Sequence, residues 1–169
     1  MKVYFLILTI LAATSISASQ PKKKIDIGIS LSPAGSFTAS SSKIKGKVLV
    51  MKNGSIVAKN IRVPIKSLVT GIELRDQHLK KKLGIEKNPR GMLLLVSATG
   101  KNQTGKGLFK VLGKTQESPF KYKILSKKYA KASFKLDLTK FDVKGISYMG
   151  VGVKKLVDIS ITLPLKFEK

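Results

Sequence analysis

The pattern that decides the fold is clearest in the stretch Val157-Asp158-Ile159-Ser160-Ile161-Thr162-Leu163-Pro164-Leu165-Lys166-Phe167. Apolar residues occupy every second position, and the residues between them are polar or charged apart from Pro164. Successive side chains of a β-strand point to opposite faces, so this alternation predicts a strand with one buried face. The same period predicts strands over residues 25–31, 56–65, 120–124 and 130–138.

Shorter apolar runs add further strands, at residues 44–51, 92–98 and 107–112. Asn53-Gly54 is typical of a tight hairpin turn, and residues 99–105 and 113–118 are predicted to be loops. About eight or nine short strands with glycine-containing turns indicate a mainly β protein. We predict a single antiparallel eight-stranded barrel, because closure removes exposed strand edges. Its interior is either packed solid or holds one slender ligand, and the alternation does not distinguish the two.

One stretch departs from the strand period, between Ser67 and Leu79. Leu68, Ile72 and Leu79 are spaced by four and seven residues, which is the period of a helix face. Three lysines and then Gly84 follow, as is typical of a helix C-terminus. We therefore predict one short helix after the fourth strand region, covering one mouth of the barrel.

This helical stretch also gathers Arg75, Asp76 and His78, the only histidine of the chain. Asp76 cannot face His78 on a helix, because neighbouring side chains on a helix surface are three or four residues apart. We interpret the three residues as structural, tying the helix to the barrel mouth through hydrogen bonds.

The composition is strongly basic, with 33 Lys and Arg against 9 acidic residues and a net charge of +24. Such a charge attracts polyanions and anionic surfaces. Nearly all the cations are lysines, which are hydrated point charges, whereas specific phosphate recognition favours the planar fork of arginine. We therefore expect a solvated basic surface and no specific nucleic-acid partner. The chain has no cysteine, which excludes disulfides and thiol chemistry.

The first residues have the three-part pattern of a secretory signal peptide. Met1-Lys2 is followed by an apolar run over residues 3–13 and then by small residues. The run is shorter than the about 20 residues of a membrane span. We predict a signal peptide over residues 1–18 with cleavage within 17–19, a basic flexible start over 19–24, and one barrel domain over 25–169. The mature protein is expected to be exported and soluble.

Catalytic and metal-binding patterns are missing from the sequence. His78 has no sequence partner for a catalytic triad, and no Gly-x-Ser-x-Gly motif occurs. No cluster of histidines or acids has metal-ligand spacing. We predict that the protein is not an enzyme, that it has neither catalytic nor metal-binding residues, and that it requires no cofactor.

Four groups of residues occur in a characteristic order. They are Ser36-Phe37 with Ile44-Lys45-Gly46, Ser67-Leu68-Val69-Thr70-Gly71 with Arg75-Asp76-Gln77-His78-Leu79, residues 107–115, and Gly150-Val151-Gly152-Val153 leading to residues 157–161. Together they resemble the YceI-like family of exported bacterial polyisoprenoid-binding proteins, over essentially the whole mature chain. The second group is the most specific, because it is similar to the family's Ser-x-x-Thr-Gly and Arg-Asp-x-His-Leu. The third group has Leu112 where the family has histidine, and residues 138–143 lack the family's arginine.

The resemblance implies a lipocalin-like barrel in the periplasm, with an apolar tunnel for an isoprenoid or quinone-type lipid. Inward-facing residues and the helical stretch together give the predicted lumen: Ile61, Val63, Leu68, Ile72, Leu79, Phe120, Tyr122, Ile124, Ala132, Phe134, Leu136, Ile159, Ile161 and Leu163. Small residues such as Ala130 and Ala132 leave room that a packed core would waste.

An alternative remains at this point: a cationic secreted barrel with a filled core that binds anionic surfaces or polyanions. The two hypotheses are compatible, because a basic exterior could dock a lipid carrier on an anionic membrane. The sequence predicts neither the identity of the lipid nor the oligomeric state.

Overall fold

The computed structural model describes residues 20–143, 147–148 and 151–169. The predicted signal peptide with its cleavage region, and Gly150 of the fourth family-like group, lie outside the described residues. The strands are β1 (Lys24–Ser32), β2 (Ser36–Ser41), β3 (Val48–Val50), β4 (Ile56–Pro64), β5 (Met92–Lys101), β6 (Thr104–Val111), β7 (Lys114–Ser126), β8 (Tyr129–Asp137), β9 (Ser147–Tyr148) and β10 (Val151–Phe167). The helices are η1 (Ile65–Ser67), α1 (Glu73–Lys82) and η2 (Leu138–Phe141), where η marks a 3-10 helix. β1 thus begins one residue before the predicted start of the barrel.

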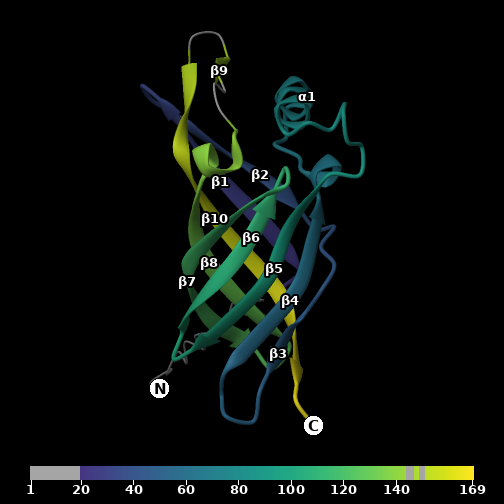
Figure 1. Cartoon of the computed structure of the whole chain (residues 1–169), viewed down its shortest axis with the longest axis vertical. Coiled ribbons are helices and arrows are strands. Elements are labelled where there is room, and N and C mark those ends of the chain that lie inside the picture. The colour runs from purple at the N-terminus through teal and green to yellow at the C-terminus, as the bar shows by residue number, and fades with distance from the viewer. Residues whose placement is uncertain (1–19, 144–146, 149–150) are drawn as a thin grey trace, which may run out of the picture.

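The strands form one sheet in the order β2-β1-β10-β3-β4-β5-β6-β7-β8, with β9 paired to β10 (Figure 1). β8 also pairs with β10, so that seven strands from β10 through β3 to β8 close a ring. β1 and β2 extend the wall beside β10. The predicted single barrel is confirmed, with a closed ring of seven strands plus these extra strands where eight strands were predicted, and all but one of its junctions are antiparallel.

One junction of the ring is parallel, between β3 and the end of β10. The reason is the length of β10, whose 17 residues exceed those of any neighbour. Its first part pairs with β1 and its last three residues pair with β3, along the edge that faces away from β8. The clearest strand of the sequence therefore serves as the seam of the barrel.

Two predicted loops are strand in the structure. The β5–β6 turn contains only Asn102 and Gln103, and the β6–β7 turn contains only Leu112 and Gly113. All four residues have positive φ, as the two central residues of a type I′ hairpin turn require. Residues 99–101, 104–105 and 114–118 pair in register on either side of these turns. Their glycines and polar residues concealed the strand period in the sequence.

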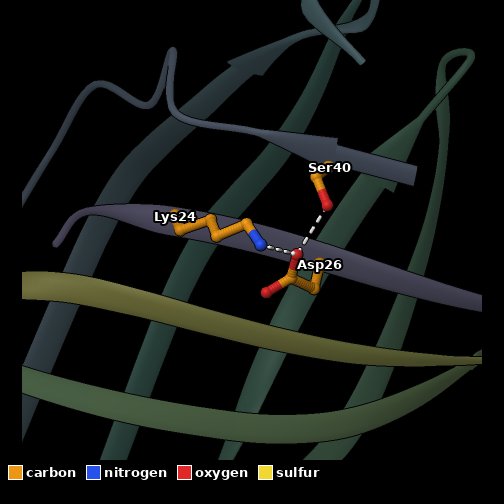
Figure 2. A network of polar contacts seen from close by, with 3 residues as sticks. All are labelled: Lys24, Asp26 and Ser40. Carbon is orange, nitrogen blue, oxygen red and sulfur yellow. Dashed lines mark hydrogen bonds and ion pairs between the residues drawn. The ribbon is translucent and has the colours of Figure 1, made fainter. Parts of the chain in front are cut away.

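The alternation of the strands separates an apolar interior from a polar exterior. Ile25, Ile27 and Ile29 of β1 point inward and are buried. On the outer wall, Asp26 Oδ1 accepts a hydrogen bond from Ser40 Oγ at 2.6 Å and lies 2.8 Å from Lys24 Nζ (Figure 2). Lys24 is therefore part of an ordered strand rather than of the flexible start.

The ionisation of Asp26 reflects this outer-wall contact. Partial burial raises the pKa of the Asp26 carboxyl, but hydrogen bonds from Lys24 and Ser40 and the charges of Lys24 and Lys131 outweigh it. The net effect holds the pKa below its usual value. The carboxylate therefore joins β1 to β2 in its charged form.

The helix α1 follows β4 and η1 and lies at the same end of the barrel as η2 and β9 (Figure 1). A short α-helix follows the fourth strand, as predicted, but the residues on its cavity-facing side differ from the prediction. Leu68 is extended and precedes the helix, and Ile72 is the N-cap, so only Leu79 of the three predicted residues lies within α1. Gly71, at φ +81°, redirects the chain between η1 and α1. Within the described residues, no helix is long and apolar enough to cross a membrane.

Candidate functional site

The interior of the barrel contains a cavity of about 770 Å³. Small-molecule sites typically measure about 300–1,000 Å³, so this volume is sufficient for a ligand. Its walls are apolar side chains from strands around the barrel, and α1 and η2 contribute at one end. The filled core of the alternative hypothesis is therefore contradicted, because the lumen is hollow.

Most residues predicted to face the lumen do line this cavity. Twelve of the fourteen do so: Ile61, Val63, Leu68, Ile72, Leu79, Phe120, Ala132, Phe134, Leu136, Ile159, Ile161 and Leu163. They come from β4, β7, β8, β10 and the α1 region, so the barrel brings together residues that are far apart in the sequence.

Tyr122 and Ile124 do not line the cavity, and their positions along β7 show why. Phe120 borders the cavity, Tyr122 is buried but lies beyond it, and Ile124 is 50% exposed. The cavity thus ends between Phe120 and Tyr122, and the buried interior ends between Tyr122 and Ile124. The placement of Ile124 in the lumen is wrong, because β7 continues past the packed end of the barrel while its alternation persists.

The packed end is built from aromatic rings and close backbone contacts. Phe120 and Tyr122 are tilted against each other with ring centroids 6.1 Å apart. A Cβ added at Gly100 would meet Tyr122 at 3.1 Å, and one added at Gly105 would overlap Phe120 and the Thr99 carbonyl oxygen. The rings thus occupy the space that side chains at these glycines would need. We call this the closed end.

The opposite end is the mouth, where α1 lies. Arg75, His78, Leu79, Lys82 and Leu83 all line the cavity. Their spacing of three and four residues places them on one face of the helix. No residue of α1 itself is buried. The helix therefore covers the lumen loosely, and its inner face is partly cationic.

Two apolar residues mark the entrance beside α1. Ile72 and Leu74 line the cavity, yet they are 51% and 49% exposed. A side chain that borders the lumen and also meets solvent lies where the lumen opens. The start of α1 is therefore the portal of the cavity.

Several contacts hold α1 and its preceding segment on the rim. Asp76 Oδ1 accepts hydrogen bonds from Thr70 N at 2.7 Å and from Thr70 Oγ1 at 2.6 Å. The Arg75 guanidinium lies 4.4 Å from the centre of the Phe37 ring on β2, a cation–π contact. The Thr70 and Asp76 of the family-like signature thus fix the start of the helix. His78 also makes a contact with its surroundings.

A second set of contacts fixes the segment that leads into α1. The hydroxyl of Ser67 donates to the Pro64 carbonyl at 2.7 Å and lies 2.7 Å from the hydroxyl of Ser41. Ser40 and Val69 exchange backbone hydrogen bonds at 2.8 and 3.0 Å. Arg75 and Asp76 therefore belong to a larger group of ties that includes Ser67.

Sequence reasoning missed part of the lining. Phe109 stacks on Phe134 with ring centroids 4.3 Å apart, and both border the cavity. Phe109 alternates with Val111, a signal that could have placed both residues inside. Phe141 and Val143, in and after η2, also line the cavity, and no strand period marks them.

The polar groups of the lining are few and lie in two segments. Among the described residues they are Arg75, His78, Lys81, Lys82 and Ser147, and the other described lining residues are apolar. Among the described residues, no group of three or more His, Asp or Glu could hold a metal ion. This arrangement can remove an apolar chain from water and leave one polar end at α1.

Comparisons with known proteins agree with the fold. The model of the YceI-like domain matches residues 13–165. A polyisoprenoid binding domain from Saccharophagus degradans, implicated in plant cell wall breakdown, superposes with a TM-score of 0.56. It is 10% identical, over 83% of this chain and 91% of that one. The YCEI protein of Campylobacter jejuni is 16% identical over 98% of this chain and 94% of its own, with a TM-score of 0.44. No curated protein matches the chain.

Proposed function

Because the chain belongs to the YceI-like family, we propose that it is an exported protein that binds the isoprenoid chain of a quinone or polyprenyl lipid. The observation that carries this proposal is the apolar cavity of about 770 Å³ with its portal at α1. The similar domain from Saccharophagus degradans is itself a polyisoprenoid binding domain. The role is that of a carrier or sequestering protein, with no catalytic step.

The energy of binding favours a long chain. Burial of apolar surface contributes about 0.8 kcal/mol per methylene, or about 4 kcal/mol for each isoprene unit. Association costs about 4–15 kcal/mol in lost freedom of motion, so several units must be buried before binding is favourable. The apolar lumen between α1 and Phe120 would therefore favour a polyprenyl chain over a shorter one.

A titration with isoprenoid alcohols tests this function. Delipidated protein is first loaded with a fluorescent lipid probe. Geranylgeraniol should displace this probe at a far lower concentration than geraniol. The preference should exceed about 100-fold, since each unit that the cavity can bury adds several kcal/mol. Equal and weak binding of both alcohols would contradict the proposal.

A periplasmic location follows from the leader-like residues 1–18 as part of the same proposal. Cell fractionation should recover the protein in the periplasm, and N-terminal sequencing should show a mature chain that begins at residue 18 or 19. Recovery of the uncleaved chain in the cytoplasm would refute this part of the proposal.

An anionic membrane is the proposed docking surface of the carrier. Val69, Ile72 and Leu74 are about half exposed near the mouth, and the lysines of the last turn of α1 lie on the same short helix. Apolar insertion and lysines near an anionic surface, at about 1 kcal/mol each, would act together there. Docking in this orientation would place the portal against the bilayer.

Vesicle sedimentation with matched variants tests the docking surface. Binding to phosphatidylglycerol vesicles should fall several-fold in the double variant Ile72→Ser with Leu74→Ser. The matched control is Ile124→Ser with Leu125→Ser, which removes exposed apolar side chains at the closed end. Equal losses in the two double variants would show that the mouth has no special role.

A further inference from the structure

The deep end of the lumen is a floor in which aromatic rings lie over glycines. Ile56, Gly100, Gly105 and Phe120 are successive cross-strand partners on β4, β5, β6 and β7. A Cβ added at Gly105 would lie 2.5 Å from Phe120 Cζ, and one added at Gly100 would lie 3.1 Å from Tyr122 Cε1. The two rings therefore occupy space above backbone that carries no side chain of its own.

The height of this floor depends on Phe120 in particular. Ile56 and Phe120 border the cavity, whereas Tyr122 is buried beyond it. Because Gly105 has no side chain, removal of the Phe120 ring would open space down to the Gly105 backbone and toward Tyr122. The lost ring is similar in size to one isoprene unit. A single side chain thus sets the depth of the lumen.

The floor offers a ligand no polar side chain. Among the described residues, the polar side chains of the lining belong to α1 and to Ser147. Near the floor, the stacked rings of Phe109 and Phe134 border the cavity. A polar chain end buried there would lose its hydrogen bonds to water, which costs free energy. Hydrocarbon gains from the same burial without any directional contact, so the floor distinguishes hydrocarbon chains by their length.

From this geometry we propose that Phe120 is the residue that sets the longest isoprenoid chain that the lumen accommodates. This inference rests on the proposed function, because it concerns a chain bound inside the barrel. Each isoprene unit adds affinity as long as the lumen can bury it, until the chain end reaches Phe120. Further units remain at the portal, where Ile72 and Leu74 meet solvent, and add much less.

A series of alcohols tests the role of Phe120 by displacement of a fluorescent lipid: geraniol, farnesol, geranylgeraniol and longer polyprenyl alcohols. In the native protein each added unit should tighten binding by at least about tenfold up to a limiting length, and by less than about twofold beyond it. In Phe120→Ala the limiting length should increase by one unit. The matched control is Phe37→Ala, which removes the same ring from the cavity wall beside Arg75 at the mouth and should leave the limiting length unchanged.

A second variant, Ala98→Leu, tests the opposite direction and does not depend on the stability of Phe120→Ala. Ala98 borders the cavity and precedes Gly100 by two residues on β5, which places it about 7 Å nearer the mouth along the strand. Its cross-strand partners are Ala58 and Gly107, so a leucine there would extend into the lumen between the mouth and Phe120. The limiting length should decrease by at least one unit.

The outcomes separate this inference from the proposed function. An unchanged limiting length in either folded variant would overturn the role of Phe120 and leave lipid binding standing. An equal increase in Phe37→Ala would also overturn it, because the volume of the lumen rather than its floor would then set the limit. Affinity that rises through the whole series in the native protein would show that the chain does not stop at Phe120. Failure of every alcohol to bind would instead refute the function itself.

Discussion

The two ends of the barrel, the mouth where α1 lies (Figure 1) and the closed end, are packed in different ways. At the closed end, Phe120, Tyr122 and Ile56 are buried and press on glycines of β5 and β6. At the mouth, no residue of α1 is buried, and the portal residues Ile72 and Leu74 meet solvent. The closed end is thus tightly packed, whereas the helix at the mouth is held by a few polar contacts. Under the proposed function, a ligand would enter past α1 and its chain would stop at Phe120.

The largest expected effect is at the closed end. Phe120→Ala should lower the free energy of unfolding by about 3–5 kcal/mol, because it removes a buried ring and leaves a void. Denaturant unfolding measures this loss. Phe167→Ala is the control, since Phe167 is 54% exposed and its replacement should change stability by less than about 0.5 kcal/mol. A similar loss in both variants would mean that the closed end is not tightly packed.

Glycine substitutions compare the two ends directly. Gly105→Ala should cost about 1–3 kcal/mol, because the new Cβ would overlap the Phe120 ring and the Thr99 carbonyl oxygen. Gly152→Ala, at the mouth end of β10, should be nearly neutral, because nothing lies within 4 Å of the added Cβ. Thermal unfolding of the two variants checks the difference. Equal melting temperatures would contradict the contrast between the ends.

The polar tie of α1 should matter locally rather than globally. Asp76→Ala removes two hydrogen bonds to Thr70, worth about 1 kcal/mol or more. Since α1 buries no residue, amide exchange in α1 should accelerate about tenfold while exchange in the barrel strands stays unchanged. Glu73→Ala on the same turn is the control and should have little effect. Uniform acceleration across the strands would show that α1 unfolds only with the whole barrel.

The smallest expected effect lies on the outer wall, away from both ends. Because the folded-state pKa of Asp26 is lowered from 3.8, its contact with Lys24 and Ser40 adds stability above that value. This stability is lost as the pH falls through the folded-state pKa. The side chain is 35% exposed, so the effect should be only about 0.5 kcal/mol. Asp26→Asn should therefore flatten the acid limb of a stability–pH profile, whereas Glu117→Gln on the surface should not. A steeper acid limb in Asp26→Asn would contradict the lowered pKa of Asp26 in the folded protein.

Much of the barrel was predictable because alternation reports directly on which strand face is buried. The run from Val157 to Phe167 is the seam strand, and nine of the eleven residues that alternation placed inward line one cavity. The limits of the barrel were not predictable from the same signal. Alternation continues through Ile124 after the interior has ended, and it does not show that the long β10 pairs with both β1 and β3 on one edge.

The mouth was harder to predict for a different reason. Spacing of apolar residues suggested a helix face through Leu68, but the helix starts after the turn at Gly71, where Asp76 accepts hydrogen bonds from Thr70. The true inner face mixes Arg75 and Lys82 with leucines, so an apolar pattern could not reveal it. The sequence alone does not show that charged residues lie on the inner face of a helix, because this requires knowledge of the cavity beneath them.

Extraction of lipid from the native protein tests the central claim most directly. The protein would be purified from its own cells without detergent and examined by native mass spectrometry, followed by solvent extraction. We expect an excess mass that is released on extraction as a molecule with a polyprenyl chain. A protein of bare polypeptide mass that also fails to take up added polyprenyl lipid would contradict the account.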